Sequence, residues 1–149
     1  MITDQEAMEA ALAEAHKAAE AGEVPIGAVV VHDGAIIVHG QNSVLRDNDP
    51  TAHAEIVALR KAAKTLGNYR LNGCTLYVTL EPCSMCAGAM IHARLDRLVY
   101  AAADPKAGAA GSVLSVLNHP QLNHKMLAEQ GTLREESAEL LRSFFRERR

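Results

Sequence analysis

The sequence predicts an α/β domain in three layers, with helices on both faces of a central five-stranded mixed sheet. Helical and strand-like segments alternate along the 149 residues, which is typical of a sheet covered on both sides. Two early strand-like runs, 27–31 and 35–38, are joined by His32-Asp33-Gly34 and predict a hairpin. Hairpin strands are antiparallel, so the sheet is expected to be mixed. The length fits a single domain over residues 1–149.

The first half of the chain places two helices around this hairpin. Thr3-Asp4-Gln5-Glu6 fits a capping box and opens an alanine-rich and glutamate-rich helix that runs to about Ala21. The polar segment 41–51 contains a proline and predicts a loop. Residues 52–64 then predict a second helix, whose apolar face carries Ile56, Leu59, Ala62 and Ala63.

The second half begins with the strongest strand signal in the chain. The Asn72-Gly73 turn precedes an apolar strand at 74–80. Pro82 is suited to a helix start and opens a helix to about Ala93. The remaining segments predict, in order, a strand at 95–101, a loop at 104–111, a short helix at 112–117, a loop at 118–125, a fifth strand at 126–130 and a terminal helix at 134–148.

Composition indicates a protein with no membrane partner. Hydrophobic residues make up 48% and charged residues 22% of the chain, which is ordinary for a globular protein. No apolar run approaches the ~20 residues that span a bilayer. The first six residues are acidic, whereas a secretory signal is basic and then apolar. We therefore expect a cytoplasmic location.

Three cysteines, an odd number, argue against a disulfide framework. Cys74 lies in the apolar run 74–80 and is expected to be a buried core residue. Cys83-Ser84-Met85-Cys86 has two interpretations in a reducing compartment, metal ligation or redox exchange. A redox motif would need its own βαβ context and no metal-binding histidine nearby, so His53 favours a metal.

His53, Cys83 and Cys86 together offer three zinc ligands. Three protein ligands leave a fourth position open, which distinguishes a catalytic zinc site from a closed structural one. Both cysteines lie at a predicted helix start, where the helix dipole favours thiolate over thiol. A structural zinc knuckle and a metal-free site are the alternatives, but no fourth ligand is evident. The sequence thus predicts one Zn²⁺ per subunit.

Glu55 follows His53 by two residues and is the predicted catalytic residue. A zinc ion lowers the pKa of a bound water toward ~7. A nearby carboxylate that does not bind the metal can take the proton from that water and pass it on.

The charge pattern leaves the partner open. A net charge of −3 disfavours a nucleic-acid partner. The C-terminal end is nevertheless basic, and it carries Arg142, Arg146, Arg148 and Arg149. These arginines either form a phosphate-binding patch or stabilise a solvated helix end through the helix dipole.

The His-x-Glu and Pro-Cys-x-x-Cys elements form the signature of zinc nucleobase deaminases. Over nearly its whole length the chain resembles the TadA-type bacterial tRNA adenosine deaminases of the cytidine deaminase superfamily. The resemblance implies a cytidine deaminase-like fold. It also implies hydrolytic deamination of adenosine to inosine at the wobble position of a tRNA anticodon, by a homodimer that binds the anticodon stem-loop. The segments that carry the resemblance are 23–28, 49–56, 68–71, 75–90, 108–112 and 144–146.

The resemblance also implies residue roles. His53, Cys83 and Cys86 would be the zinc ligands, and Glu55 the proton shuttle. Asn42 would hydrogen-bond the target nucleotide, although a loop asparagine that caps its own turn is the plainer interpretation. The Ala54 N–H would bind the base edge, and an apolar wall would contact the ring through Val24, Pro25 and Ile26. Further RNA contacts would come from Asp104, Lys106, Asn123, Phe144, Phe145 and Arg146, with one of the two phenylalanines packing inward.

Three alternatives share parts of this pattern. A deaminase of free nucleobases or nucleosides, such as guanine or cytosine, would keep the same zinc core, but the aromatic and basic terminal helix and the 104–112 loop favour RNA. A catalytically silent binding subunit would be expected to lack Glu55. An engineered DNA-editing deaminase is disfavoured by Asp104.

Overall fold

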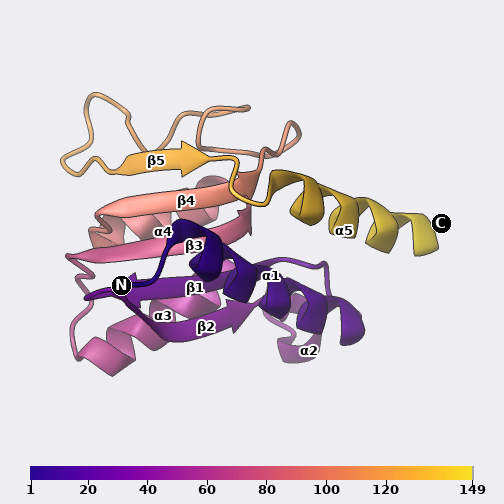
Figure 1. The fold of residues 1–149 in the computed structure, drawn as a ribbon. Coiled ribbons are helices and arrows are strands. Elements are labelled where there is room, and N and C mark those ends of the chain that lie inside the picture. Colours follow the sequence, from indigo (N-terminus) through magenta and orange to yellow (C-terminus); the bar gives the residue numbers. More distant parts are fainter. Residues whose placement is uncertain (149) are drawn as a thin grey trace.

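The computed structural model describes residues 1–148 and contains a five-stranded sheet between two layers of helices (Figure 1). Arg149, one of the terminal arginines, lies outside the described residues. The helices are α1 (Asp4–Glu20), α2 (Val44–Asp47), α3 (Ala54–Leu66), α4 (Ser84–Ala93) and α5 (Arg134–Glu147). The strands are β1 (Gly27–His32), β2 (Ala35–Gln41), β3 (Cys74–Leu80), β4 (Arg97–Ala102) and β5 (Leu127–Gln130).

The sheet is mixed, as the early hairpin predicted. Its order is β2-β1-β3-β4-β5. β1 is antiparallel to both β2 and β3, whereas β3, β4 and β5 run parallel. β5 confirms the weakly signalled strand at 126–130. No helix among residues 1–148 is both long and apolar enough to cross a membrane.

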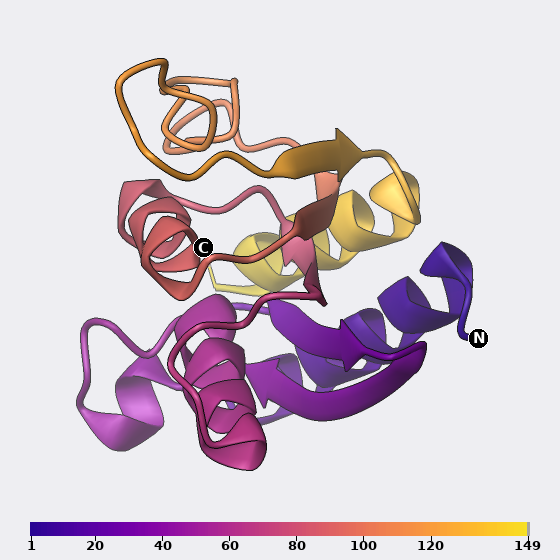
Figure 2. The same cartoon turned by 90° about the vertical axis from the view of Figure 1, so that its left-hand side faces the viewer.

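Alternating side chains divide the core between the two faces of the sheet. α1 and α5 cover one face, and α3 and α4 cover the other (Figure 2). Val29, Tyr77 and Val99 belong to the cluster under α1, while the residues next to them in the strands belong to the cluster under α3 and α4. This period of two is the normal consequence of strand geometry.

Close packing of β2 against α3 requires a glycine. A Cβ atom at Gly40 would lie 2.7 Å from the Ala54 carbonyl oxygen and 2.8 Å from the Ala58 nitrogen. Both atoms belong to the helix backbone, so a larger residue would push α3 away from the sheet. Because Ala54 opens α3, this contact fixes the helix end that carries His53 and Glu55.

The structure corrects the sequence prediction in two segments. The predicted loop 41–51 contains the short helix α2, and β2 extends to Gln41. The carboxylate of Glu23 accepts hydrogen bonds from the Leu45 and Arg46 N–H groups, and this stabilisation comes from a distant part of the chain. The short helix predicted at 112–117 is absent.

In place of the predicted helix at 112–117, Ala110 forms an isolated bridge with Ser115. The N–H groups of Ala110 and Ser112 are bound by the carboxylate of Glu81. These two donors are therefore held in a loop around a buried acid. The local pattern of apolar residues gives no sign of this contact.

A polar cluster joins α1 to three strands. The Tyr77 hydroxyl donates to Asp4 Oδ1 at 2.6 Å. Arg97 donates to both oxygens of Asp4, at 2.9 and 2.6 Å, and to Glu129 at 2.8 Å. The cluster thus ties the start of α1 to β3, β4 and β5.

Replacing Tyr77 with Phe should change the stability of the fold at alkaline pH. Burial, and to a lesser extent the hydrogen bond to Asp4, raises the pKa of Tyr77 to about 12, whereas the ordinary value is about 10. The unfolded chain therefore loses this proton first, and the free energy of unfolding falls as pH rises from about 10 to 12. In urea titrations, the free energy of unfolding of Tyr77→Phe should fall less steeply over that pH window than that of the wild type.

Equal slopes for Tyr77→Phe and the wild type would contradict the prediction.

Candidate active site

The starts of α3 and α4 meet and bring three ligand atoms together. His53 is the N-cap residue of α3 and Cys83 that of α4, and Cys86 lies in the first turn of α4. The Nδ1 atom of His53 lies 3.6 Å from the Cys83 sulfur and 3.5 Å from the Cys86 sulfur. Within residues 1–148, no other set of three His, Cys, Asp or Glu side chains lies close enough to hold a metal ion.

These separations fit a tetrahedral metal site. Zn–S bonds of ~2.3 Å and Zn–N bonds of ~2.0–2.1 Å at a tetrahedral angle imply a sulfur-to-nitrogen distance of roughly 3.6 Å. Both observed distances match it. No fourth His, Cys, Asp or Glu of the described chain joins the group. The three side chains can therefore hold a metal and leave one position for a small ligand.

The two cysteines differ in charge when no cation compensates them. The hydrogen bond from the Cys86 thiol, followed by that from His53, lowers the pKa of Cys83 to about 3. The same hydrogen bond and burial raise the pKa of Cys86. The hydrogen bond to Cys83 also raises the pKa of His53. Protein groups alone thus support one thiolate, and binding of a divalent cation would release protons from the others.

Glu55 is a buried acid beside this centre. It is 4% exposed, and burial raises its pKa to about 7. Its Oε1 atom finds no hydrogen-bond partner among residues 1–148. An unpaired buried carboxyl oxygen is costly in a finished core. The atom is therefore available for a water molecule or a substrate group, and a pKa near neutrality suits acid–base catalysis.

Asn42 lies next to the predicted apolar wall. Its Nδ2 atom donates to the Val24 carbonyl oxygen, and its Oδ1 atom accepts from the Val44 N–H, both at 3.3 Å. Its backbone N–H donates to the Ile26 carbonyl oxygen at 3.1 Å. Asn42 thus does cap its own turn, as the plainer interpretation proposed. One N–H of Nδ2 has no acceptor assigned among residues 1–148.

The remaining members of the predicted pocket are the apolar wall and the first residue of α3. Pro25 is buried, and Val24 and Ile26 on either side of it are half-buried. Ala54 is the first residue of α3, a position where backbone N–H groups have no acceptor within the helix.

A cavity of about 820 Å³ brings most of the predicted RNA contacts together. It lies between the loop after β4 and helix α5, and its lining includes Val24, Asp104, Lys106, Phe145 and Arg146. The cavity shares Val24 with the predicted apolar wall, whereas none of His53, Glu55, Cys83 and Cys86 lines it. Oδ1 of Asp104 accepts from the N–H groups of Lys106 and Ala107 at 3.0 and 3.3 Å, so this carboxylate also shapes its own turn.

The two phenylalanines of α5 point in different directions. Phe144 is 7% exposed, and the Arg148 guanidinium lies 3.6 Å from the centre of its ring. Phe145 is 50% exposed and lines the cavity. The rings contact each other edge to face, with centres 5.5 Å apart. Phe144 thus packs inward, and Phe145 is the ring that a ligand can reach.

The structure does not bring Asn123 to this group. Asn123 is exposed and lines a different cavity of about 340 Å³, together with Tyr69 and His92. Asn123 therefore stays a predicted RNA contact, one that lies apart from the cavity lined by Phe145.

Sequence reasoning missed Glu81, which organises the loop after β4. This residue is 2% exposed and accepts hydrogen bonds from the N–H groups of Asp104, Ala110 and Ser112, at 3.0, 2.9 and 3.1 Å, and from the Ser112 hydroxyl. A Cβ atom at Gly108 would overlap this carboxylate. The sequence did carry one sign of this role, since Glu81 is a charged residue placed directly between the apolar strand and Pro82.

Comparisons with known proteins agree with this site. The MafB19-like deaminase family model matches residues 2–149. The tRNA-specific adenosine deaminase of Haemophilus influenzae is 50% identical over 147 residues, which are 98% of this chain and 85% of that protein. A structure from a study of A-to-I editing by tRNA:A34 deaminases at the wobble position of transfer RNA superposes with a TM-score of 0.88 and 50% identity, covering 91% of this chain and 98% of the other.

The chain belongs to the tRNA-specific adenosine deaminase family. Its mixed sheet and two helical layers match the cytidine deaminase-like fold of this family, as the resemblance implied. Guanine deaminases share the fold. The structure of guanine deaminase from Bacillus subtilis superposes with a TM-score of 0.67 and 38% identity, covering 98% of this chain and 95% of that one.

Removing one ligand should remove the metal. The wild type is expected to bind one zinc ion per chain, and Cys86→Ala should lose it because two ligands hold zinc poorly. Metal content after gel filtration measures this. Cys74→Ala is the matched control, since Cys74 is fully buried in β3, away from the group of three. Metal retained by Cys86→Ala, or lost equally by both variants, would contradict the assignment.

Proposed function

We propose that the chain hydrolyses adenosine at the wobble position of a tRNA anticodon, so that adenosine and water give inosine and ammonia. The observation that carries the proposal is the His53, Cys83 and Cys86 group beside the unpaired buried Glu55, in a chain whose relatives are named tRNA-specific adenosine deaminases. The activity would belong to one domain over residues 1–149. A tRNA substrate would place that activity in the cytoplasm.

Glu55 is the proton carrier of the proposed reaction. A zinc ion held by the three ligands would supply Lewis-acid activation of a water molecule. Glu55 accepts a proton from the attacking water at Oε1, which has no competing partner in residues 1–148. It delivers this proton to N1 of the adenine ring, then takes the second proton from the oxygen added at C6 and passes it to the departing amine, which leaves as ammonia. A pKa of about 7 lets the same carboxyl act as base and then as acid.

The pocket residues orient the nucleotide. The unassigned N–H of Asn42 donates to the target nucleoside, and the Ala54 N–H donates to the base edge. The ring packs against the wall formed by Val24, Pro25 and Ile26. A base in a single-stranded anticodon loop can leave its stack at low cost, which makes this buried position accessible.

The cavity next to this pocket favours RNA over a free base. It joins the half-exposed ring of Phe145 to the basic groups of Lys106, Arg142 and Arg146. An aromatic platform beside cations suits stacked bases and phosphates. A free guanine or cytosine has no phosphate for such a surface to bind.

We also propose a homodimer formed through α3 and α4. A cavity of about 380 Å³ on this face is lined mainly by apolar groups, including Leu59, Ala63 and Ala93. Tyr69 borders it and is 69% exposed. An apolar face of this kind, with polar residues at its rim, suits a second copy of the chain.

The reaction is tested with an anticodon stem-loop that carries a wobble adenosine. The wild type should produce inosine. Glu55→Gln keeps the side-chain volume but cannot carry a proton, so turnover should fall by at least about 10²-fold while zinc content stays unchanged. Turnover of free guanine or cytosine without action on the stem-loop would contradict the proposed substrate.

The dimer is tested by charge insertion. Ala63→Arg should convert the wild-type dimer to a monomer in sedimentation experiments, because an arginine would be buried without a partner. Ala13→Arg places the same residue on an exposed position of α1 and should remain dimeric. A wild-type monomer, or an Ala63→Arg dimer, would contradict the assigned face.

A further inference from the structure

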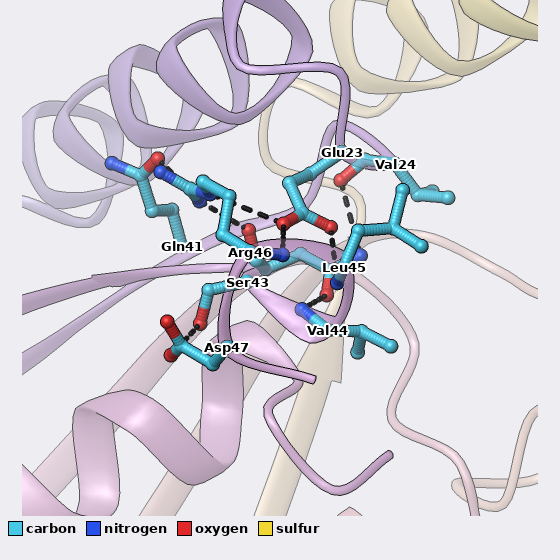
Figure 3. A network of polar contacts seen from close by, with 9 residues as sticks. Glu23, Val24, Gln41, Ser43, Val44, Leu45, Arg46 and Asp47 are labelled. Atoms are coloured by element: carbon cyan, nitrogen blue, oxygen red, sulfur yellow. Dashed lines mark hydrogen bonds and ion pairs between the residues drawn. The ribbon is translucent and has the colours of Figure 1, made fainter. Parts of the chain in front are cut away.

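Glu23 is a buried acid that the proposed reaction does not use. It lies between α1 and the apolar wall and is 1% exposed. Its carboxylate accepts from the N–H of Leu45 at 3.0 Å, the N–H of Arg46 at 2.9 Å and Nε of Arg46 at 3.1 Å (Figure 3). A buried carboxylate is tolerated when its oxygens are satisfied in this way.

These contacts stabilise α2 from outside. The four-residue helix α2 has no side-chain cap from its own N-cap residue, Ser43. A helix this short does not persist by itself. Glu23 supplies the missing acceptors for two of its first N–H groups. The place of α2 therefore depends on a residue about twenty positions earlier in the chain.

Arg46 carries the connection on to Asn42. Its Nη2 atom donates to the Asn42 carbonyl oxygen at 2.7 Å and to Gln41 Oε1 at 3.0 Å, while Nε stays on Glu23. The guanidinium is planar, so one side chain holds both partners at a fixed angle. A lysine could not do this with its single charged nitrogen.

The contacts close into a ring of four residues that includes Asn42. Asn42 Nδ2 donates to the carbonyl oxygen of Val24, which directly follows Glu23. Glu23, Arg46, Asn42 and Val24 are thus linked in sequence by hydrogen bonds and one peptide bond, as Figure 3 shows from Glu23 and Val24 across to Arg46. The ring also fixes the Asn42 amide, since Oδ1 faces a donor and Nδ2 faces an acceptor.

We propose that Glu23 and Arg46 are positioning residues, which hold Asn42 and the Val24–Ile26 wall at a fixed separation before the nucleotide arrives. The inference rests on the proposed function for its substrate. Neither residue need touch the base, because each acts through Asn42. Preorganised sites of this kind bind without the cost of ordering their own side chains.

The test is a double-mutant cycle in zinc-loaded full-length protein. Glu23→Gln keeps the shape but places an amide NH₂ toward Arg46. It should lower kcat/KM for the wobble-adenosine stem-loop about 10-fold or more, because small misplacements of a reacting group are costly. In an Asn42→Ala background the same change should cost less than about 2-fold.

Glu14→Gln is the matched control, because Glu14 is also a buried acid but pairs with Lys17 on α1. It should leave kcat/KM unchanged. Equal losses for Glu23→Gln in both backgrounds would mean that Glu23 only supports folding, and an unchanged kcat/KM would overturn the inference directly. If Glu23→Gln does not fold, Arg46→Met replaces it in the cycle. Arg46→Met removes the guanidinium but keeps the two backbone hydrogen bonds to Glu23.

Amide hydrogen exchange separates this inference from the proposed function. Exchange at Leu45 and Arg46 should accelerate about 10-fold or more in Glu23→Gln and not in Glu14→Gln. If the wild type fails to convert adenosine, the proposed function falls, and the exchange result still decides whether Glu23 holds α2. If the wild type is active and exchange is unchanged in Glu23→Gln, the positioning role falls alone.

Discussion

The meeting of two helix N-termini is the constraint on which the site depends. His53 and Cys83 are the N-cap residues of α3 and α4, so each ligand is placed by the helix that follows it. α3 is held against β2 by the close approach at Gly40, and α4 follows directly from β3. The distances of 3.5 and 3.6 Å between ligand atoms therefore depend on the spacing of strands across the sheet. If the strands were arranged in a different order, the same three ligands would lie far from one another.

Glu23, Glu55 and Glu81 are buried carboxylates, and their hydrogen bonds decide what each can do. Glu23 and Glu81 accept several donors each. Burial alone would raise their pKa values, but these hydrogen bonds outweigh it and lower both pKa values below the usual range. Such groups stay charged and hold loops in place. Glu55 is equally buried but leaves one oxygen unpaired in the described chain, and burial raises its pKa to about 7. Hydrogen-bond donors thus distinguish a structural buried acid, whose oxygens are paired, from a reactive one with an unpaired oxygen.

The parts of the fold that could be predicted are those with local causes. The capping box at Thr3 is present, and the hairpin and the strand at 74–80 lie where apolar runs and turn residues placed them. The ligand group follows from the spacing of His53, Cys83 and Cys86. The helices α3 and α4 begin two residues later than expected, because their ligands serve as N-caps. The errors at α2 and at 112–117 have distant causes, since Glu23 and Glu81 bind backbone N–H groups more than twenty residues away. No local pattern encodes such a contact.

Substrate choice must then come from the surroundings of the metal centre, because deaminases of free guanine share the fold. In this chain the candidate surfaces are the loop that Glu81 holds and the exposed side of α5, which together line one cavity. Arg142 and Arg146 are already paired with Glu139, at 3.0 and 3.2 Å, so a phosphate would have to displace that carboxylate. All three side chains are more than half exposed, and exposed ion pairs contribute little to stability. Displacing the Glu139 carboxylate by a phosphate therefore costs little. In the free protein, pairing with Glu139 keeps both arginines at the rim of the cavity, and Phe145 lies between them in sequence. A surface arranged in this way would present its arginines to a phosphate at little cost.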